Sequence, residues 1–194
     1  TLCDMCFMTK CPYVPPHEWA VDFPHLMLRY RAAELKAGKS DPIGKQVTET
    51  DRNGKLAALA APVVNLANAN PAARIAMEST IGVDRRAALP KFHGRTFVLR
   101  AMEEPIGADK RAPAYGRKAV LYATCFVNYN NPDIGMAARA VLAANGVETE
   151  VVYPRCCGMP QFERGDVARV AEHAVTVADA LLPYVNEGYD VIAL

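Results

Sequence analysis

The sequence has almost no surplus charge and no long, uninterrupted apolar run. Its 22 lysines and arginines nearly balance its 21 aspartates and glutamates. The formal net charge is therefore only +1, which gives no overall positive field to attract nucleic acid. The longest stretch without a charged residue, 56–73, contains two prolines and three asparagines, whereas a membrane-spanning helix needs about 20 mostly apolar residues. We therefore expect neither a nucleic-acid partner nor a membrane span.

No secretory leader is visible in this sequence either. The sequence begins at Thr1 without a methionine and ends at Leu194 inside a short apolar run, and no basic, apolar segment precedes a cleavage site. We expect a fragment or a processed piece of a longer chain. With 51% hydrophobic and 22% charged residues among 194, the composition is typical of a folded, soluble protein with one domain or two small ones.

Six cysteines are the most informative residues of the sequence. Nothing marks the chain as secreted, and it is large enough to fold without disulfides, so a reduced, cytoplasmic setting is expected. In that setting clustered thiolates usually bind a metal or carry out redox chemistry. The two groups are Cys3, Cys6 and Cys11, and then Cys125, Cys156 and Cys157.

The first group reads CDMCFMTKCP, a CxxC pair followed by Cys-Pro. A CxxC turn can direct two thiolates at one metal site. Bacterial ferredoxin motifs end in CxxxCP, whereas here four residues separate the last two cysteines, and the cysteine expected three residues before Cys3 would precede Thr1. Two alternatives stay open: a zinc site completed by His17, and cysteines that are simply buried.

The second group reads TCFVNYNNP and YPRCCGMP. The backbone of two adjacent cysteines can wrap around a cluster so that both Cys156 and Cys157 reach it. Gly158, which lacks a Cβ, then lets the main chain approach closely. The alternative is a strained disulfide between the adjacent cysteines that acts as a thiol switch.

Helix is predicted for much of the chain before residue 117. The proline-rich segment 12–19 is instead expected to form an extended strap. Asp22 is predicted to cap a helix that stops at Gly38, with His25 at its surface or in its cap. Further predicted helices cover 42–50, 55–69 and 71–81, followed by a wrapping linker with an added strand over 96–101.

The last third predicts strand, helix, strand, helix, strand, which means a parallel sheet with right-handed crossovers. Ligands collect at the carboxyl ends of such strands. Cys125 follows the first strand, and Cys156 and Cys157 follow the second, so we expect the three thiols to converge at one edge. The predicted strands are 119–124, 147–153 and 191–194, and the predicted helices run from Asn131 to Gly146 and over 166–185.

The sequence has too few cysteines to supply every ligand of two iron–sulfur clusters. A [4Fe-4S] cluster normally takes four thiolates, and each group has three. We expect one missing cysteine before Thr1 and another after Leu194, beyond the third predicted strand.

These motifs carry a family resemblance. CDMCFMTKCP resembles the second half of a dicluster ferredoxin motif, and TCFVNYNNPDIG with RCCGMP resembles the cysteine-rich CCG domain. Together they resemble the iron–sulfur subunits of heterodisulfide reductase, glycolate oxidase and anaerobic glycerol-3-phosphate dehydrogenase. The resemblance implies an α/β chain: a remnant of a helical ferredoxin domain over 1–38, a mostly helical linker over 39–116, and a truncated βαβαβ CCG domain over 117–194.

The resemblance also implies a function. The chain would be an electron-transfer subunit of an oxidoreductase, carrying electrons from a flavoprotein dehydrogenase subunit through [4Fe-4S] clusters to a quinone or a disulfide. It would be cytoplasmic or peripheral on the inner membrane, with a membrane anchor subunit as a further partner. Catalytic disulfide or thiol reduction at the CCG cluster and a zinc-stabilised interaction module are the alternatives. By this resemblance, Cys3 and Cys6 hold one ferredoxin cluster, Cys11 reaches the other, and Cys125, Cys156 and Cys157 hold the CCG cluster.

Overall fold

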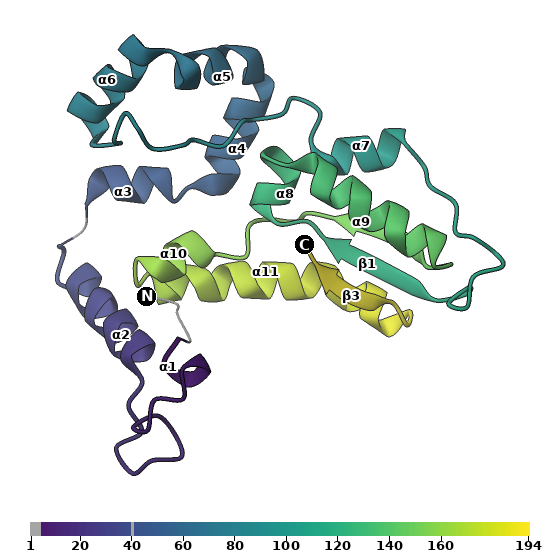
Figure 1. The fold of residues 1–194 in the computed structure, drawn as a ribbon, viewed down its shortest axis with the longest axis horizontal. Coiled ribbons are helices and arrows are strands. Elements are labelled where there is room, and N and C mark those ends of the chain that lie inside the picture. The colour runs from purple at the N-terminus through teal and green to yellow at the C-terminus, as the bar shows by residue number, and fades with distance from the viewer. Residues whose placement is uncertain (1–4, 40) are drawn as a thin grey trace. The chain divides into compact units, whose positions relative to one another are not determined.

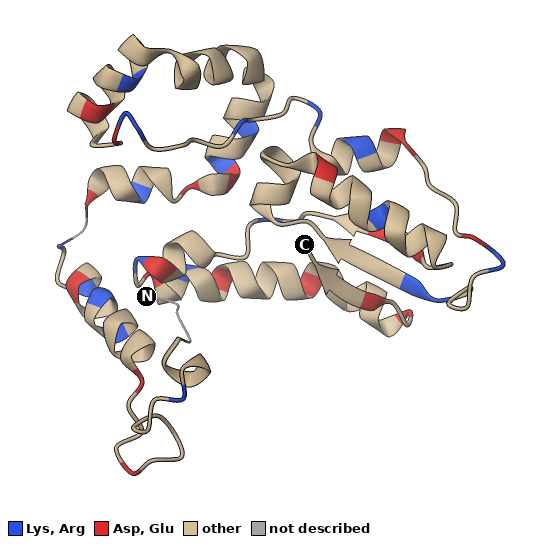
Figure 2. Cartoon of the chain, in the orientation of Figure 1, with Lys and Arg blue, Asp and Glu red and all other residues tan. Residues whose placement is uncertain are grey.

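The computed structural model describes residues 5–39 and 41–194. The chain divides into two compact units, one made of the residues up to Thr48 with Cys157–Ala174, the other of Glu49–Cys156 with Val175–Leu194. Figure 2 shows basic and acidic residues interspersed along both units, as expected for a nearly neutral chain. No helix formed by the described residues has the length and apolar character needed to cross a membrane.

The main helix of the first unit begins as the sequence predicts. The Asp22 side chain accepts the backbone N–H of His25, whose ring stays exposed. Near the other end of this helix, Arg31 donates to the Glu163 carboxylate at 3.2 Å. This unit contains α1 (Met5–Met8), α2 (Phe23–Lys36), α3 (Pro42–Val47), α10 (Met159–Glu163) and the first part of α11 (Val167–Asn186).

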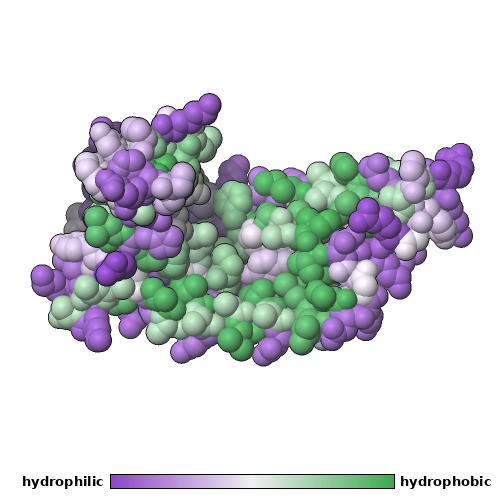
Figure 3. Space-filling model, turned by 90° about the horizontal axis from the view of Figure 1, so that it is seen from below, coloured by the Kyte–Doolittle hydropathy of each residue, from purple (hydrophilic) through white to green (hydrophobic). Residues whose placement is uncertain are grey.

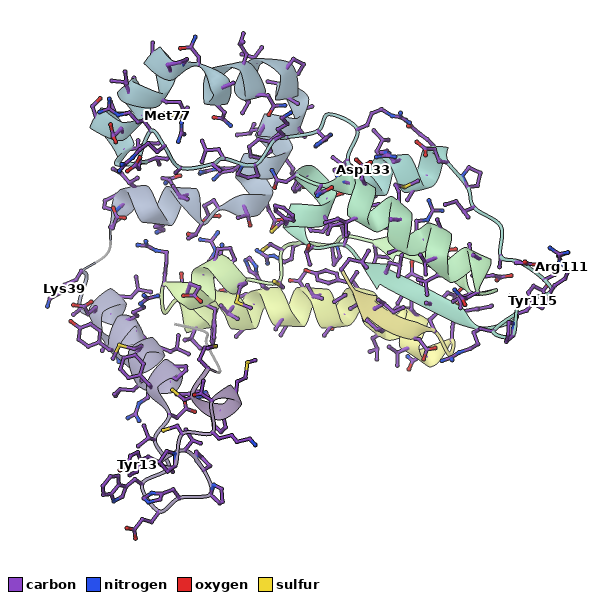
Figure 4. The ribbon with its side chains drawn as sticks, in the orientation of Figure 1. Tyr13, Lys39, Met77, Arg111, Tyr115 and Asp133 are labelled. Carbon is purple, nitrogen blue, oxygen red and sulfur yellow. The ribbon has the colours of Figure 1, made fainter. Side chains whose placement is uncertain are left out.

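The proline-rich segment 12–19 is not the extended strap that its composition predicts. It forms consecutive turns, which the N–H of Val21 closes by donating to the Tyr13 carbonyl at 2.9 Å. Tyr13, labelled in Figure 4, stacks on Trp19 with ring centroids 5.1 Å apart. Proline excludes a helix here but suits a turn, and the aromatic stacking packs the two sides of the loop together.

A three-stranded parallel sheet in the order β2-β1-β3 forms the centre of the second unit (Figure 1), which confirms the predicted strand-helix alternation. Tyr122 at the end of the central strand pairs with Val152 on one side and Ala193 on the other. The three strands therefore end at the same edge of the sheet. They are β1 (Lys118–Tyr122), β2 (Glu148–Val152) and β3 (Asp190–Ala193).

The core of the second unit lies where helices pack on this sheet. Leu121 from β1 and Phe97 are completely buried. A Cβ on Gly135 would lie 2.5 Å from the Phe97 ring, so the glycine lets its helix approach the ring closely. The helices around this core are α7 (Phe97–Glu103), α8 (Cys125–Tyr129) and α9 (Pro132–Ala144).

The strand predicted over 96–101 is wrong, because this segment begins the helix α7. The hydroxyl of Thr96 accepts the N–H of Leu99 and caps it. Phe97 and Ala101, four residues apart, both face the core, and that spacing is helical. Arg100 of this helix pairs at 2.6 Å with Asp133, which lies at the start of α9 and is labelled in Figure 4.

The predicted helix over 55–69 is two helices with a break at Ala60. Pro62 lies in the first turn of the second helix, where proline is tolerated because its missing N–H would have no partner inside the helix. Asn70 caps the next helix by accepting the N–H groups of Ala72 and Ala73. These helices are α4 (Thr50–Leu59), α5 (Ala61–Ala69) and α6 (Pro71–Ile81).

The helix predicted over 166–185 is α11. In its second half, Val175, Leu182 and Val185 are 61%, 54% and 50% exposed. Figure 3 shows apolar residues at the surface on the face seen from below. These apolar side chains of α11 are therefore only partly buried.

Candidate metal centre

Two of the three later cysteines meet at the carboxyl edge of the sheet. Cys125 follows β1 as the first residue of α8, and Cys156 follows β2. Their Sγ atoms are 3.8 Å apart. The expected convergence is thus confirmed for this pair, which we call the thiol pair, while its role as a ligand set stays a prediction.

Local hydrogen bonds fix both cysteine turns. Thr124 accepts the N–H of Val127 and starts α8 directly after the strand. In the other turn, the Tyr122 hydroxyl donates to the Arg155 carbonyl at 2.7 Å. Cys156 is buried and Cys157 is exposed, so the two adjacent cysteines have different surroundings.

An aspartate from a distant part of the sequence holds the second turn. Both carboxylate oxygens of Asp51 accept the Cys156 backbone N–H, at 3.0 and 2.9 Å, and one of them also accepts the hydroxyl of Tyr153. Asp51 lies in the first turn of α4. No sequence signal marks this residue, since an acidic side chain in a first helical turn is common for electrostatic reasons alone.

Two tyrosines line the same region. The ring of Tyr129, the last residue of α8, meets that of Tyr153 edge to face with centroids 5.6 Å apart. Burial and the hydrogen bond to Asp51 raise the pKa of Tyr153, so its phenol remains a hydrogen-bond donor. Burial, followed by the charge of Asp51, raises the pKa of Tyr129. Both tyrosines are therefore neutral at physiological pH.

A pocket of about 700 Å³ opens beside these rings. Its lining is mostly apolar, and Lys55, Thr96 and Asn128 are among the residues that line it. The lining residues are Lys55, Ala58, Leu59, Gly94, Thr96, Val98, Asn128, Tyr129 and Tyr153.

The first cysteine group is only partly described, because Cys3 lies outside the described residues. Cys6 lies in α1, and the N–H of Cys11 donates to its carbonyl at 2.9 Å. Both are half-buried. The ring of His17, the alternative zinc ligand, packs against Tyr13 and Trp19 and accepts the Trp19 N–H through Nδ1.

The donor chemistry of the thiol pair fits a metal. Two thiolates bound to one tetrahedral metal atom by bonds of about 2.3 Å lie about 3.8 Å apart, which is the spacing of Cys125 and Cys156. Thiolates select zinc and the iron of iron–sulfur clusters. Within 5–39 and 41–194, no three cysteine, histidine or acidic side chains are arranged to hold a metal ion, so the pair would supply two ligands of a larger set.

Comparison with known proteins finds one matching domain family and relatives of part of the chain. Residues 119–193 match the family model of the cysteine-rich domain, CCG. The chain is 29% identical over 149 residues to the subunit designated C of anaerobic glycerol-3-phosphate dehydrogenase from Escherichia coli K12, a match that covers 76% of this chain and 37% of that protein. It is 35% identical over 78 residues to the subunit designated B of fumarate reductase (CoM/CoB) from Methanothermobacter marburgensis, covering 40% of this chain and 15% of that protein.

The match thus spans little more than a third of the length of the Escherichia coli protein. No solved structure matches the chain. The thiol pair and Cys157 all lie inside the segment that matches the domain family. Residues 119–193 of this chain accordingly match the CCG cysteine-rich domain family, and the chain is homologous over part of its length to a subunit of a dehydrogenase and a subunit of a reductase.

Proposed function

We propose that this chain is an electron-transfer part of an oxidoreductase and that the thiol pair binds an iron–sulfur cluster. The observation that carries the proposal is that Cys125 and Cys156 meet at the carboxyl edge of the sheet, with Sγ atoms 3.8 Å apart. In a cluster with one thiolate on each iron, the two sulfurs would move apart to bind different irons. Backbone turns after two parallel strands bring the two sulfurs together. Cysteines that only fill the core do not need to approach one another in this way. The homology to subunits of a dehydrogenase and a reductase supports the same role.

The cluster is proposed to be [4Fe-4S], with Cys125, Cys156 and Cys157 as its ligands in this chain. When bound, such a cluster takes up and releases single electrons. The residues of the chain hold the thiolates, bury one side of the site and set the polarity around the sulfurs. No proton-transferring side chain is required for electron hopping.

For the first unit we propose a ferredoxin-type site. Cys3 and Cys6 would hold one cluster, and Cys11 would reach a second. In the structure, Cys6 and Cys11 lie on either side of the turn that ends α1, where the Cys11 N–H donates to the Cys6 carbonyl. The division at residues 38 and 116, into a ferredoxin remnant, a linker and the cysteine-rich domain, remains part of the proposal.

The relatives' names support the presence of partner subunits, since the Escherichia coli relative is named as one subunit of a glycerol-3-phosphate dehydrogenase. From the family resemblance of the motifs, we propose a flavoprotein dehydrogenase subunit as the electron donor and a quinone or a disulfide as the acceptor. A membrane anchor subunit is a further proposed partner. The chain would then be cytoplasmic or peripheral on the inner membrane.

A second candidate function is catalytic reduction of a disulfide at the cysteine-rich domain. The pocket beside Tyr129 and Tyr153 favours it, because a mostly apolar pocket of this size suits an organic substrate. Adding a small thiol to the oxidised, anaerobically purified protein would then produce a new paramagnetic signal. The absence of such a signal would exclude this second function.

The proposed function is tested by reversible reduction. We expect the full-length protein, purified without oxygen, to show a broad visible absorption that dithionite bleaches and an oxidant restores. Cys156→Ser should weaken the bleaching, whereas Met102→Ser, which removes an exposed sulfur from the same unit, should not. A protein without visible absorption would contradict the proposal.

A further inference from the structure

Helix α4 reaches the thiol pair from a part of the chain whose sequence carries no cysteine motif. Its Asp51 contacts Cys156 across 105 residues of sequence. Gly54, one turn later, lies against the ring of Tyr129, where a Cβ would come within 2.3 Å of a ring carbon. The helix therefore packs close to the α8 turn that begins with Cys125, while its aspartate holds the Cys156 turn.

The hydrogen-bond pattern is specific to this carboxylate. One oxygen accepts both the Tyr153 hydroxyl and the Cys156 N–H, and the other accepts the same N–H. Tyr153 is held in turn by its edge-to-face contact with Tyr129. The Asp51 side chain thus links Tyr153, the first residue after β2, to Cys156, the fourth residue after β2.

We infer that Asp51 is a positioning residue of the candidate metal centre. Its carboxylate holds the backbone of Cys156 so that the thiol faces Cys125 before any metal binds. It also lowers the reduction potential of a cluster bound there. The first effect concerns the metal-free chain, and the second rests on the proposed function.

Two physical effects support this inference. Hydrogen bonds from a backbone N–H to a carboxylate are stronger than those to neutral acceptors, and a buried N–H that loses its acceptor is costly, so the aspartate restrains the turn. An amide that donates to a carboxylate is not available to a cluster sulfur, and the nearby negative charge opposes the uptake of an electron. Hydrogen bonds to sulfur and net charge are two of the factors that set cluster potentials.

The positioning effect is tested on metal-free protein. Diamide takes two electrons and two protons from two thiols, which become a disulfide, and peptide mass spectrometry measures how fast Cys125 and Cys156 become linked. We expect Asp51→Ala to slow this reaction about tenfold, a factor that corresponds to about 1.4 kcal/mol. Tyr153→Phe should slow it less, because the Cys156 N–H keeps its acceptor.

A matched control separates positioning from a general loss of structure. The side chain of Asp109, like that of Asp51, accepts a backbone N–H, in this case from Arg111. Asp109 lies near the amino end of β2, and its own N–H donates to the Ala143 carbonyl. In the Asp109→Ala variant, diamide should link Cys125 and Cys156 at the same rate as in the natural protein. Circular dichroism identifies variants that remain folded. A folded Asp51→Ala protein that links the two cysteines at the natural rate would overturn the inference.

The electrostatic effect is tested on protein that holds its cluster. Asp51→Asn keeps the shape of the side chain and an oxygen acceptor but removes the charge. We expect its reduction potential to rise, with the iron content unchanged, and an unchanged or lower potential would overturn this part. If the natural protein holds no iron and sulfide, the proposed function fails, whereas the diamide experiment still decides whether Asp51 positions Cys156.

Discussion

At the scale of single residues, close contacts explain why a helix can lie against the cysteine turns. Tyr129 is 4% exposed, and its ring occupies the space where a side chain at position 54 would be. Glycine in a helix costs up to about 1 kcal/mol relative to alanine, so this residue weakens α4 in order to admit the ring. This close packing lets Asp51, one turn earlier in α4, accept the N–H of Cys156.

Replacing this glycine should destabilise the protein. Gly54→Ala improves helix propensity but drives a Cβ into a buried ring, and overpacking of this kind costs about 1–3 kcal/mol. We expect a net loss of about 1–2 kcal/mol in the free energy of unfolding, measured by urea denaturation. Gly107→Ala, where no atom lies within 4 Å, is the control. A Gly54→Ala protein as stable as the natural one would show that the ring moves aside freely.

At the scale of elements, caps and prolines decide where helices begin. The cap at Asp22 was readable in the sequence because this residue stands directly before a proline-containing first turn. In the structure both Asp22 and Asn70 accept N–H groups in such a turn. The break at Ala60 and the helix over 97–103 were not readable. Their conformations depend on packing against other elements, which a local pattern does not contain.

The caps allow a paired test. Asn70→Ala removes a side chain that accepts two N–H groups and should cost about 1 kcal/mol of stability. Asn131 occupies the same position before α9 but forms no capping hydrogen bond, so Asn131→Ala should change stability by less than about 0.5 kcal/mol. Thermal unfolding followed by circular dichroism measures both. Equal effects would mean that the Asn70 bonds contribute nothing to the helix.

At the scale of the whole molecule, the alternation of strands and helices made the position of the thiol pair predictable. Parallel strands joined by helices must end at one edge, and Cys125 and Cys156 follow two of them. The contribution of Asp51 was not predictable, because a contact across 105 residues leaves no periodic or local signal. The strand pattern and the cysteine positions together therefore predicted where the sulfurs lie, whereas only the folded structure shows that Asp51 holds the Cys156 turn.

The central claim is that the gathered thiols bind an inorganic cluster. Iron, acid-labile sulfide and zinc measured together in the anaerobically purified full-length protein test it most directly. The account predicts iron and sulfide in comparable amounts, with both reduced when Cys125 and Cys156 are replaced by serine. One zinc per chain with no sulfide would contradict it.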